Sequence, residues 1–133
     1  MDENSYLDGT PGDPSMWSYN NYAIGVAGST LELVADTTVD EYMKENFFEP
    51  IGVDASFYSG NFSGNPRLAT LYESDGGVER TVAEAKAISS ANSPGHNVSL
   101  HAGSLTASAK DIAKLFYILS NDGEYGGKRI LSE

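Results

Sequence analysis

The triplet Tyr19-Asn20-Asn21 offers the side chains of this sequence best suited to chemistry, one phenol and two carboxamides. It lies between a turn-forming segment, residues 10–14, and residues 22–28, which carry no charge. That placement puts the triplet at the N-terminal mouth of a predicted buried helix. An asparagine there can cap the helix through its side-chain oxygen, and the same position can face a cleft.

A helix over residues 20–35 is predicted to carry this triplet at its start. Its first half has no charge and should be buried on most sides, and Glu32 is its one charged residue. Gly25 and Gly28 each cost helix stability on the order of 1 kcal/mol relative to alanine. We expect another backbone to approach the helix closely at these two glycines.

Two further helices are predicted around the first. Residues 38–48 begin with a capping box formed by Thr38 and Glu41. This helix should end before Pro50, because the residue that precedes a proline is pushed out of the α region. Residues 108–121 begin with Ser108 as the cap and carry an amphipathic apolar face. An Asn-Asp-Gly sequence then ends this third helix.

The rest of the chain is predicted to be less regular. Residues 1–16 form an irregular lead-in, and residues 84–104 form a loop rich in serine and asparagine. In residues 66–83, two short strands around the turn Asp75-Gly76-Gly77 make at most one small β-hairpin. The predicted fold class is therefore mainly α (α+β), with residues 1–133 forming a single domain.

The composition argues against several kinds of partner. The formal net charge is −11, from 8 basic and 19 acidic residues, so the chain should repel nucleic acids and anionic membranes. Cysteine is absent, and His96 and His101 form no zinc pattern, so we expect no metal and no cofactor. No run approaches the roughly 18 apolar residues of a membrane span, and the acidic start does not resemble a signal peptide.

Several segments, in the right order, resemble the serine β-lactamase-like family. The nearest branch is the group of class C β-lactamases, D-alanyl-D-alanine carboxypeptidases and related esterases. The resemblance is weak between residues 59 and 98. The matching segments are Pro11-Gly12, Tyr19-Asn20-Asn21, Glu32-Leu33-Val34, Tyr42, Glu49-Pro50-Ile51-Gly52, Phe57, Ala102-Gly103-Ser104-Leu105, residues 108–113 and residues 122–132.

The family works with three motifs: Ser-x-x-Lys, Tyr-x-Asn, and Lys or His followed by x-Gly. The second motif matches Tyr19-Asn20-Asn21, with Asn20 where the family usually has serine. No serine of this chain has a lysine three residues later, so the nucleophile motif is absent. His101-Ala102-Gly103 fits the third motif superficially, but it lies where the family has a structural turn before the last helix.

The resemblance implies the helical lobe of the β-lactamase and penicillin-binding-protein fold. The chain would then be one lobe of a larger two-lobed serine hydrolase. Its expected partners are the missing α/β lobe of the same parent protein and a small-molecule or peptide substrate. The chain by itself gives no location, whereas the resemblance implies an extracytoplasmic parent.

The resemblance also implies roles for two residues, Tyr19 as a catalytic residue and Asn21 as a substrate-binding residue. A tyrosine has an ordinary pKa of about 10 and acts as a base near neutral pH only where a nearby cation favours the phenolate. In the family that cation is the lysine of Ser-x-x-Lys. The local sequence also allows simpler roles, with Tyr19 packed beside Trp17 and Asn21 as a plain helix cap.

Two functions remain open at this stage. The first is part of a serine hydrolase acting by acyl transfer on a β-lactam, a D-Ala-D-Ala peptide or a small ester, with the isolated chain inactive. The second is a non-catalytic binding or interaction module that kept the lobe and lost the chemistry. The sequence of the parent gene separates them, because a Ser-x-x-Lys upstream and a His/Lys-x-Gly downstream favour the enzyme.

Overall fold

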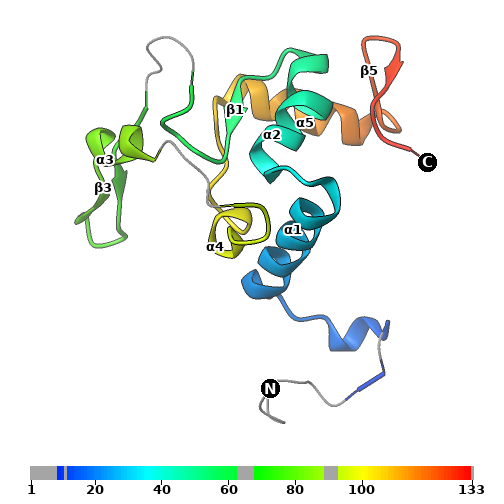
Figure 1. The fold of residues 1–133 in the computed structure, drawn as a ribbon, viewed down its shortest axis with the longest axis horizontal. Coiled ribbons are helices and arrows are strands. Elements are labelled where there is room, and N and C mark those ends of the chain that lie inside the picture. Colours follow the sequence, from blue (N-terminus) through cyan, green and yellow to red (C-terminus); the bar gives the residue numbers. More distant parts are fainter. Residues whose placement is uncertain (1–8, 11, 63–67, 89–92, 133) are drawn as a thin grey trace.

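Helices dominate the computed structural model, which describes residues 9–10, 12–62, 68–88 and 93–132 (Figure 1). The two long helices are α1 (Asn21–Ala35) and α5 (Ala109–Ser120). The shorter helical elements are η2 (Pro14–Met16), α2 (Val39–Met43), η3 (Lys44–Phe48), η4 (Glu49–Ile51), α3 (Val82–Ala87) and α4 (Val98–His101). The predicted mainly helical class is confirmed.

The strands are short and pair antiparallel, two by two. The predicted hairpin is present as β2 (Leu71–Tyr72) with β3 (Val78–Arg80). Two further pairs join β1 (Ala55–Ser56) to β4 (Thr106–Ala107) and β5 (Glu124–Tyr125) to β6 (Lys128–Arg129). These two pairs were not predicted, because strands of two residues are too short to show an alternating pattern.

Helix α1 begins and ends through local hydrogen bonds. Asn20 caps it, since its side-chain oxygen accepts a hydrogen bond from the backbone N–H of Ala23 at 3.1 Å. Asp36 ends it in the left-handed conformation with φ 51°, as the predicted break at Asp36-Thr37 requires. The backbone N–H of Thr37 then donates to the carbonyl oxygen of Glu32 at 3.3 Å.

The prediction that the first half of α1 is buried on most sides is wrong. Tyr22 is 70% exposed, and Ile24 and Val26 are each about two-fifths exposed. The covered side of α1 is a single stripe with helical spacing, formed by Gly25, Gly28, Ser29 and Glu32, of which Gly28 is half-buried. This stripe faces α4, which lies beside α1 (Figure 1), and leaves the other sides of the helix open.

Another segment approaches α1 closely at both glycines, as predicted, but the neighbouring atoms differ between the two positions. A Cβ at Gly25 would collide with the backbone carbonyl oxygen and the side chain of Val98. A Cβ at Gly28 would collide with the imidazole ring of His101, so the neighbour there is a side chain and not a backbone. Both neighbours belong to α4, and any larger side chain at these two positions would push the helices apart.

The second predicted helix begins where predicted, but the helical run continues past its predicted end. Thr38 and Glu41 form the capping box. The helical run passes through the π turn η3 and the 3₁₀ turn η4, and ends at Gly52 with φ 63°. Pro50 lies in the first turn of η4, where its missing N–H needs no partner.

The prediction of a loop over residues 84–104 is wrong in two places, because α3 and α4 lie there or overlap it. Thr81 and Glu84 form a capping box at the start of α3, with the Glu84 carboxylate accepting from the Thr81 N–H at 2.8 Å. This Thr-x-x-Glu pattern is readable in the sequence. Helix α4 has four residues, too few for a helical period to be recognised.

The hydrophobic core joins the end of the second helical run to α5. Its buried members are Phe48, Ile51, Val53, Ala55 and Ile118. Helix α5 begins at the predicted cap, where the Ser108 hydroxyl accepts from the Asp111 N–H at 3.1 Å. In Figure 1, α2 and α5 lie above α1, and the β2–β3 hairpin with α3 projects at the left of the molecule.

Candidate functional site

Tyr19 lies on the extended segment between η2 and the start of α1, and its side chain is 63% exposed. Trp17, on the same segment, is 78% exposed. The alternative in which Tyr19 packs beside Trp17 at a buried boundary therefore does not hold within the part of the chain that the structure describes. The phenol of Tyr19 is open to whatever approaches this end of α1.

Asn21 is the first residue of α1 and is exposed. The cap of this helix is Asn20, so the alternative role of Asn21 as the helix cap is wrong. Among the described residues, the Asn21 carboxamide makes no side-chain hydrogen bond. Its donor and acceptor are therefore available to a ligand.

An open hollow of about 440 Å³ is lined in part by Asn21. One wall is the first turn of α1, and the other is α4 with the turn that follows it. The structure thus brings Asn21 together with the turn at residues 102–104, whereas Tyr19 is not among the lining residues. These are Asn21, Tyr22, Val98, Ser99, Ala102, Gly103 and Ser104.

The two walls are joined by a buried network centred on Glu32, whose side chain is 1% exposed. Its carboxylate accepts hydrogen bonds from the backbone N–H groups of Val39 at 3.0 Å and Gly95 at 2.8 Å. The side-chain amide of Asn97 donates to both carboxylate oxygens, at 3.2 and 3.0 Å. One glutamate thereby connects α1, the start of α2 and the segment that leads into α4.

His101 belongs to the same network. Its Nε2 lies 3.3 Å from the Glu32 carboxylate, and its Nδ1 lies 3.1 Å from the carbonyl oxygen of Gly25. The side chain of His101 is 5% exposed. This histidine ends α4 and packs against α1.

The surroundings of Glu32 favour its ionised form. Burial on its own would raise the pKa of Glu32, but the hydrogen bonds from Val39, Asn97, Gly95 and His101 outweigh it and hold the pKa below its usual value. A buried carboxylate is tolerated only when its oxygens are satisfied in this way. The network is thus built around a charge.

Sequence reasoning did not identify this network. The sequence shows Glu32 as the one charged residue of its predicted helix and His101 as part of a superficial match to a family motif. A single charge on the face that carries Gly25 and Gly28 is the signal that could have found it. Its partners Gly95, Asn97 and His101 lie more than sixty residues away along the chain, so no local spacing could have paired them.

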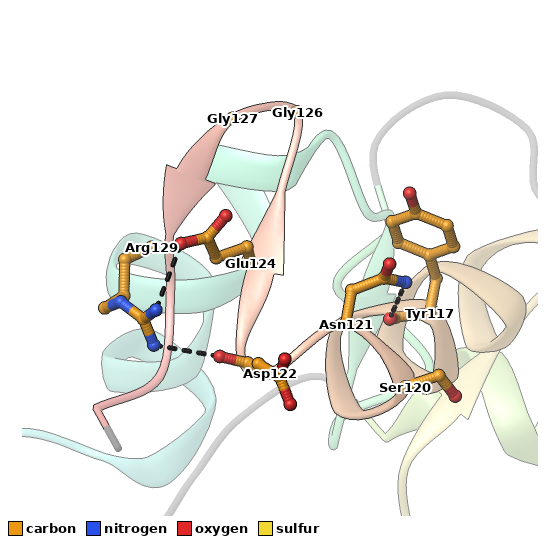
Figure 2. A pocket seen from close by; sticks show the side chains of 8 residues that line it. All are labelled: Tyr117, Ser120, Asn121, Asp122, Glu124, Gly126, Gly127 and Arg129. Carbon is orange, nitrogen blue, oxygen red and sulfur yellow. Dashed lines mark hydrogen bonds and ion pairs between the residues drawn. The ribbon is translucent and has the colours of Figure 1, made fainter.

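A second depression, of about 380 Å³, lies between the C-terminal end of α5 and the β5–β6 hairpin (Figure 2). Figure 2 shows Arg129 directed toward Glu124 and Asp122, across the depression from Tyr117. The Arg129 guanidinium bonds the Glu124 carboxylate at 3.0 Å and the Asp122 carbonyl oxygen at 2.9 Å. These polar groups satisfy one another and stabilise the hairpin, and neither Tyr19 nor Asn21 lies there.

Across residues 9–10, 12–62, 68–88 and 93–132, no group of three or more His, Cys, Asp or Glu side chains could hold a metal ion. In the same ranges, no helix has both the length and the apolar character needed to cross a bilayer.

In comparisons with known proteins, a family model matches the chain. No curated protein matches the chain. The family model described as Beta-lactamase matches residues 5–133. This match spans the Tyr19-Asn20-Asn21 triplet, the Glu32 network and α5, and it agrees with the mainly helical fold. The chain belongs to the Beta-lactamase family.

Proposed function

We propose that this chain is the helical lobe of a serine hydrolase and supplies Tyr19 and Asn21 to its acyl-transfer site. The observation that carries the proposal is the exposed Asn21 at the edge of a hollow, two residues after an exposed phenol. Its carboxamide makes no side-chain hydrogen bond to the residues that the structure describes. The substrate is a β-lactam, a D-Ala-D-Ala peptide or a small ester. Each of these offers a carbonyl oxygen that the Asn21 amide can bind.

The chemistry divides between two lobes in this proposal. Acyl transfer from a serine needs a base for the hydroxyl and an acid for the leaving group. Tyr19 transfers these protons, while the nucleophilic serine and its lysine come from an α/β lobe of the parent. The lysine ammonium lies beside Tyr19 in the assembled site and favours the phenolate.

The exposed apolar surface of the chain supports a missing lobe. Large apolar side chains on α1 and α5 face outward, with Val34 81% and Leu33, Leu119 and Phe116 about two-thirds exposed. Large apolar side chains exposed in this way are suited to an interaction with another part of the protein. We propose that the α/β lobe of the parent covers part of this surface.

The competing function is a binding or interaction module that has lost the chemistry. The absence of Ser-x-x-Lys from the chain is the observation that favours it. The two functions differ in one property of the full-length protein, which is whether it forms a covalent acyl-enzyme.

The test is made on the full-length parent protein. We expect fluorescent penicillin to label it, or a p-nitrophenyl ester to be turned over. Asn21→Ala should then lower kcat/KM about tenfold or more, because a hydrogen bond to the substrate carbonyl is lost. Asn61→Ala changes another exposed asparagine, away from the hollow, and is the matched control. A full-length protein with neither labelling nor turnover would favour the module.

A further inference from the structure

The side chain of His101 links the two walls of the hollow directly. It ends α4, and Val98 and Ser99 of this helix line the hollow opposite Asn21, together with the turn that follows. Its ring reaches across to α1, where it contacts the carbonyl of Gly25 and the carboxylate of Glu32. The proton positions on this ring therefore decide how α4 is held against α1.

The two partners of the ring are both hydrogen-bond acceptors. A backbone carbonyl oxygen cannot donate, so the contact with Gly25 requires a hydrogen on Nδ1. An ionised carboxylate cannot donate either, so the contact with Glu32 requires a hydrogen on Nε2. A neutral imidazole carries only one of these two hydrogens.

The remaining partners of Glu32 show that its carboxylate acts as an acceptor. The Val39 and Gly95 N–H groups and the Asn97 amide are all donors, and they address both carboxylate oxygens. A proton on either oxygen would compete with at least one of them. The donors therefore match an ionised glutamate, and an ionised glutamate in turn requires the second hydrogen on His101.

We propose that His101 is a buried imidazolium that acts as a positioning residue for the Asn21 site. With both ring nitrogens donating, it ties α4 to α1 one helical turn after Asn21 and so fixes the width of the hollow. Its role in positioning substrate rests on the proposed function, whereas its protonation state does not. The ligand class is the carbonyl substrate already proposed for Asn21.

Nitrogen-15 NMR of the 133-residue chain at pH 7 tests the protonation state. Both ring nitrogens of His101 should give the signature of protonated imidazole nitrogens. The variant His96→Gln removes the only other histidine and assigns the signal. In Glu32→Gln the amide of the new side chain can donate to Nε2, so the ring should become neutral with its hydrogen on Nδ1.

Several results of this NMR experiment would overturn the proposal. An unprotonated ring nitrogen in the wild-type chain overturns the proposal, and so does a Glu32→Gln variant in which both nitrogens stay protonated. If Glu32→Gln does not fold, the wild-type signature decides alone. A wild-type chain with no folded signal for His101 also counts against the proposal, because the network requires α4 packed on α1.

The positioning role has its own measurement on the full-length hydrolase. Glu32→Gln should raise KM and leave kcat unchanged, because the variant disturbs the substrate-binding wall and not the reacting groups. A fall in kcat with an unchanged KM would overturn the positioning role. A full-length protein without turnover would instead refute the proposed function and leave the NMR result standing.

Discussion

Tyr19 and Asn21 lie two residues apart and differ in their structural setting. Asn21 is fixed by the first turn of α1, whereas Tyr19 precedes the cap residue on an extended segment. The carboxamide therefore has a defined wall of the hollow behind it. The phenol is mostly exposed and does not line the hollow, and we propose that another part of the parent protein positions it.

The variant Tyr19→Phe in the full-length parent tests the proton-transfer role. It keeps the ring and removes the oxygen, so kcat/KM should fall by about 10²- to 10⁴-fold, the usual contribution of a positioned acid–base group. The folded state should be unaffected, because the side chain is mostly exposed.

Tyr72→Phe is the matched control for this variant, because Tyr72 is also 63% exposed but lies on β2. It should keep full activity. Equal and full activity in both variants would remove Tyr19 from the mechanism and leave it a surface residue.

At the scale of elements, the packing of α4 on α1 depends on the two glycines of the α1 stripe. Gly28→Leu should lower the free energy of unfolding by about 1–3 kcal/mol through overpacking against His101. Thermal unfolding of the 133-residue chain measures this change. Gly103→Ala is the control, since a Cβ there meets nothing within 4 Å. An unchanged melting temperature in Gly28→Leu would mean that α4 does not pack there.

The Glu32 network makes the same packing sensitive to acid. Because hydrogen bonds hold the pKa of Glu32 below its ordinary value of 4.5, its stabilising contribution is complete above that value. It is lost as the pH falls through the pKa of the folded state. We expect the unfolding free energy of the wild-type chain to drop below about pH 4.5, and that of Glu32→Ala to drop less.

At neutral pH, Glu32→Ala should cost about 3–5 kcal/mol, because it leaves the buried donors of Asn97, Gly95 and His101 without their acceptor. Urea unfolding measures this loss. Glu45 is exposed, and Glu45→Ala should change the stability by less than about 0.5 kcal/mol. Similar effects of the two variants would show that the network does not hold α1 to α4.

At the scale of the whole molecule, the sequence correctly predicts the features that neighbouring residues determine. The capping box at Thr38, the cap at Ser108 and the hairpin around Asp75 are all present. The starts and ends of long helices are encoded by neighbouring residues, and so the sequence shows them.

The sequence fails where distant segments decide the structure. Which face of α1 is covered depends on α4, about seventy residues later. The same distance hides the pairing of Glu32 with Asn97 and His101. The triplet of the candidate site was found from its resemblance to a family, whereas the hollow beside Asn21 depends on a turn whose approach no local pattern reveals.

Because no serine of this chain has a lysine three residues later, the activity of the isolated chain is the most direct test of its proposed role. The central claim is that this chain carries Tyr19 and Asn21 and takes its nucleophile from another lobe. The measurement is the initial rate at which the isolated 133-residue chain hydrolyses nitrocefin and a p-nitrophenyl ester. We expect a rate equal to the uncatalysed background. Robust turnover that is abolished by substituting one of the chain's own serines would contradict it.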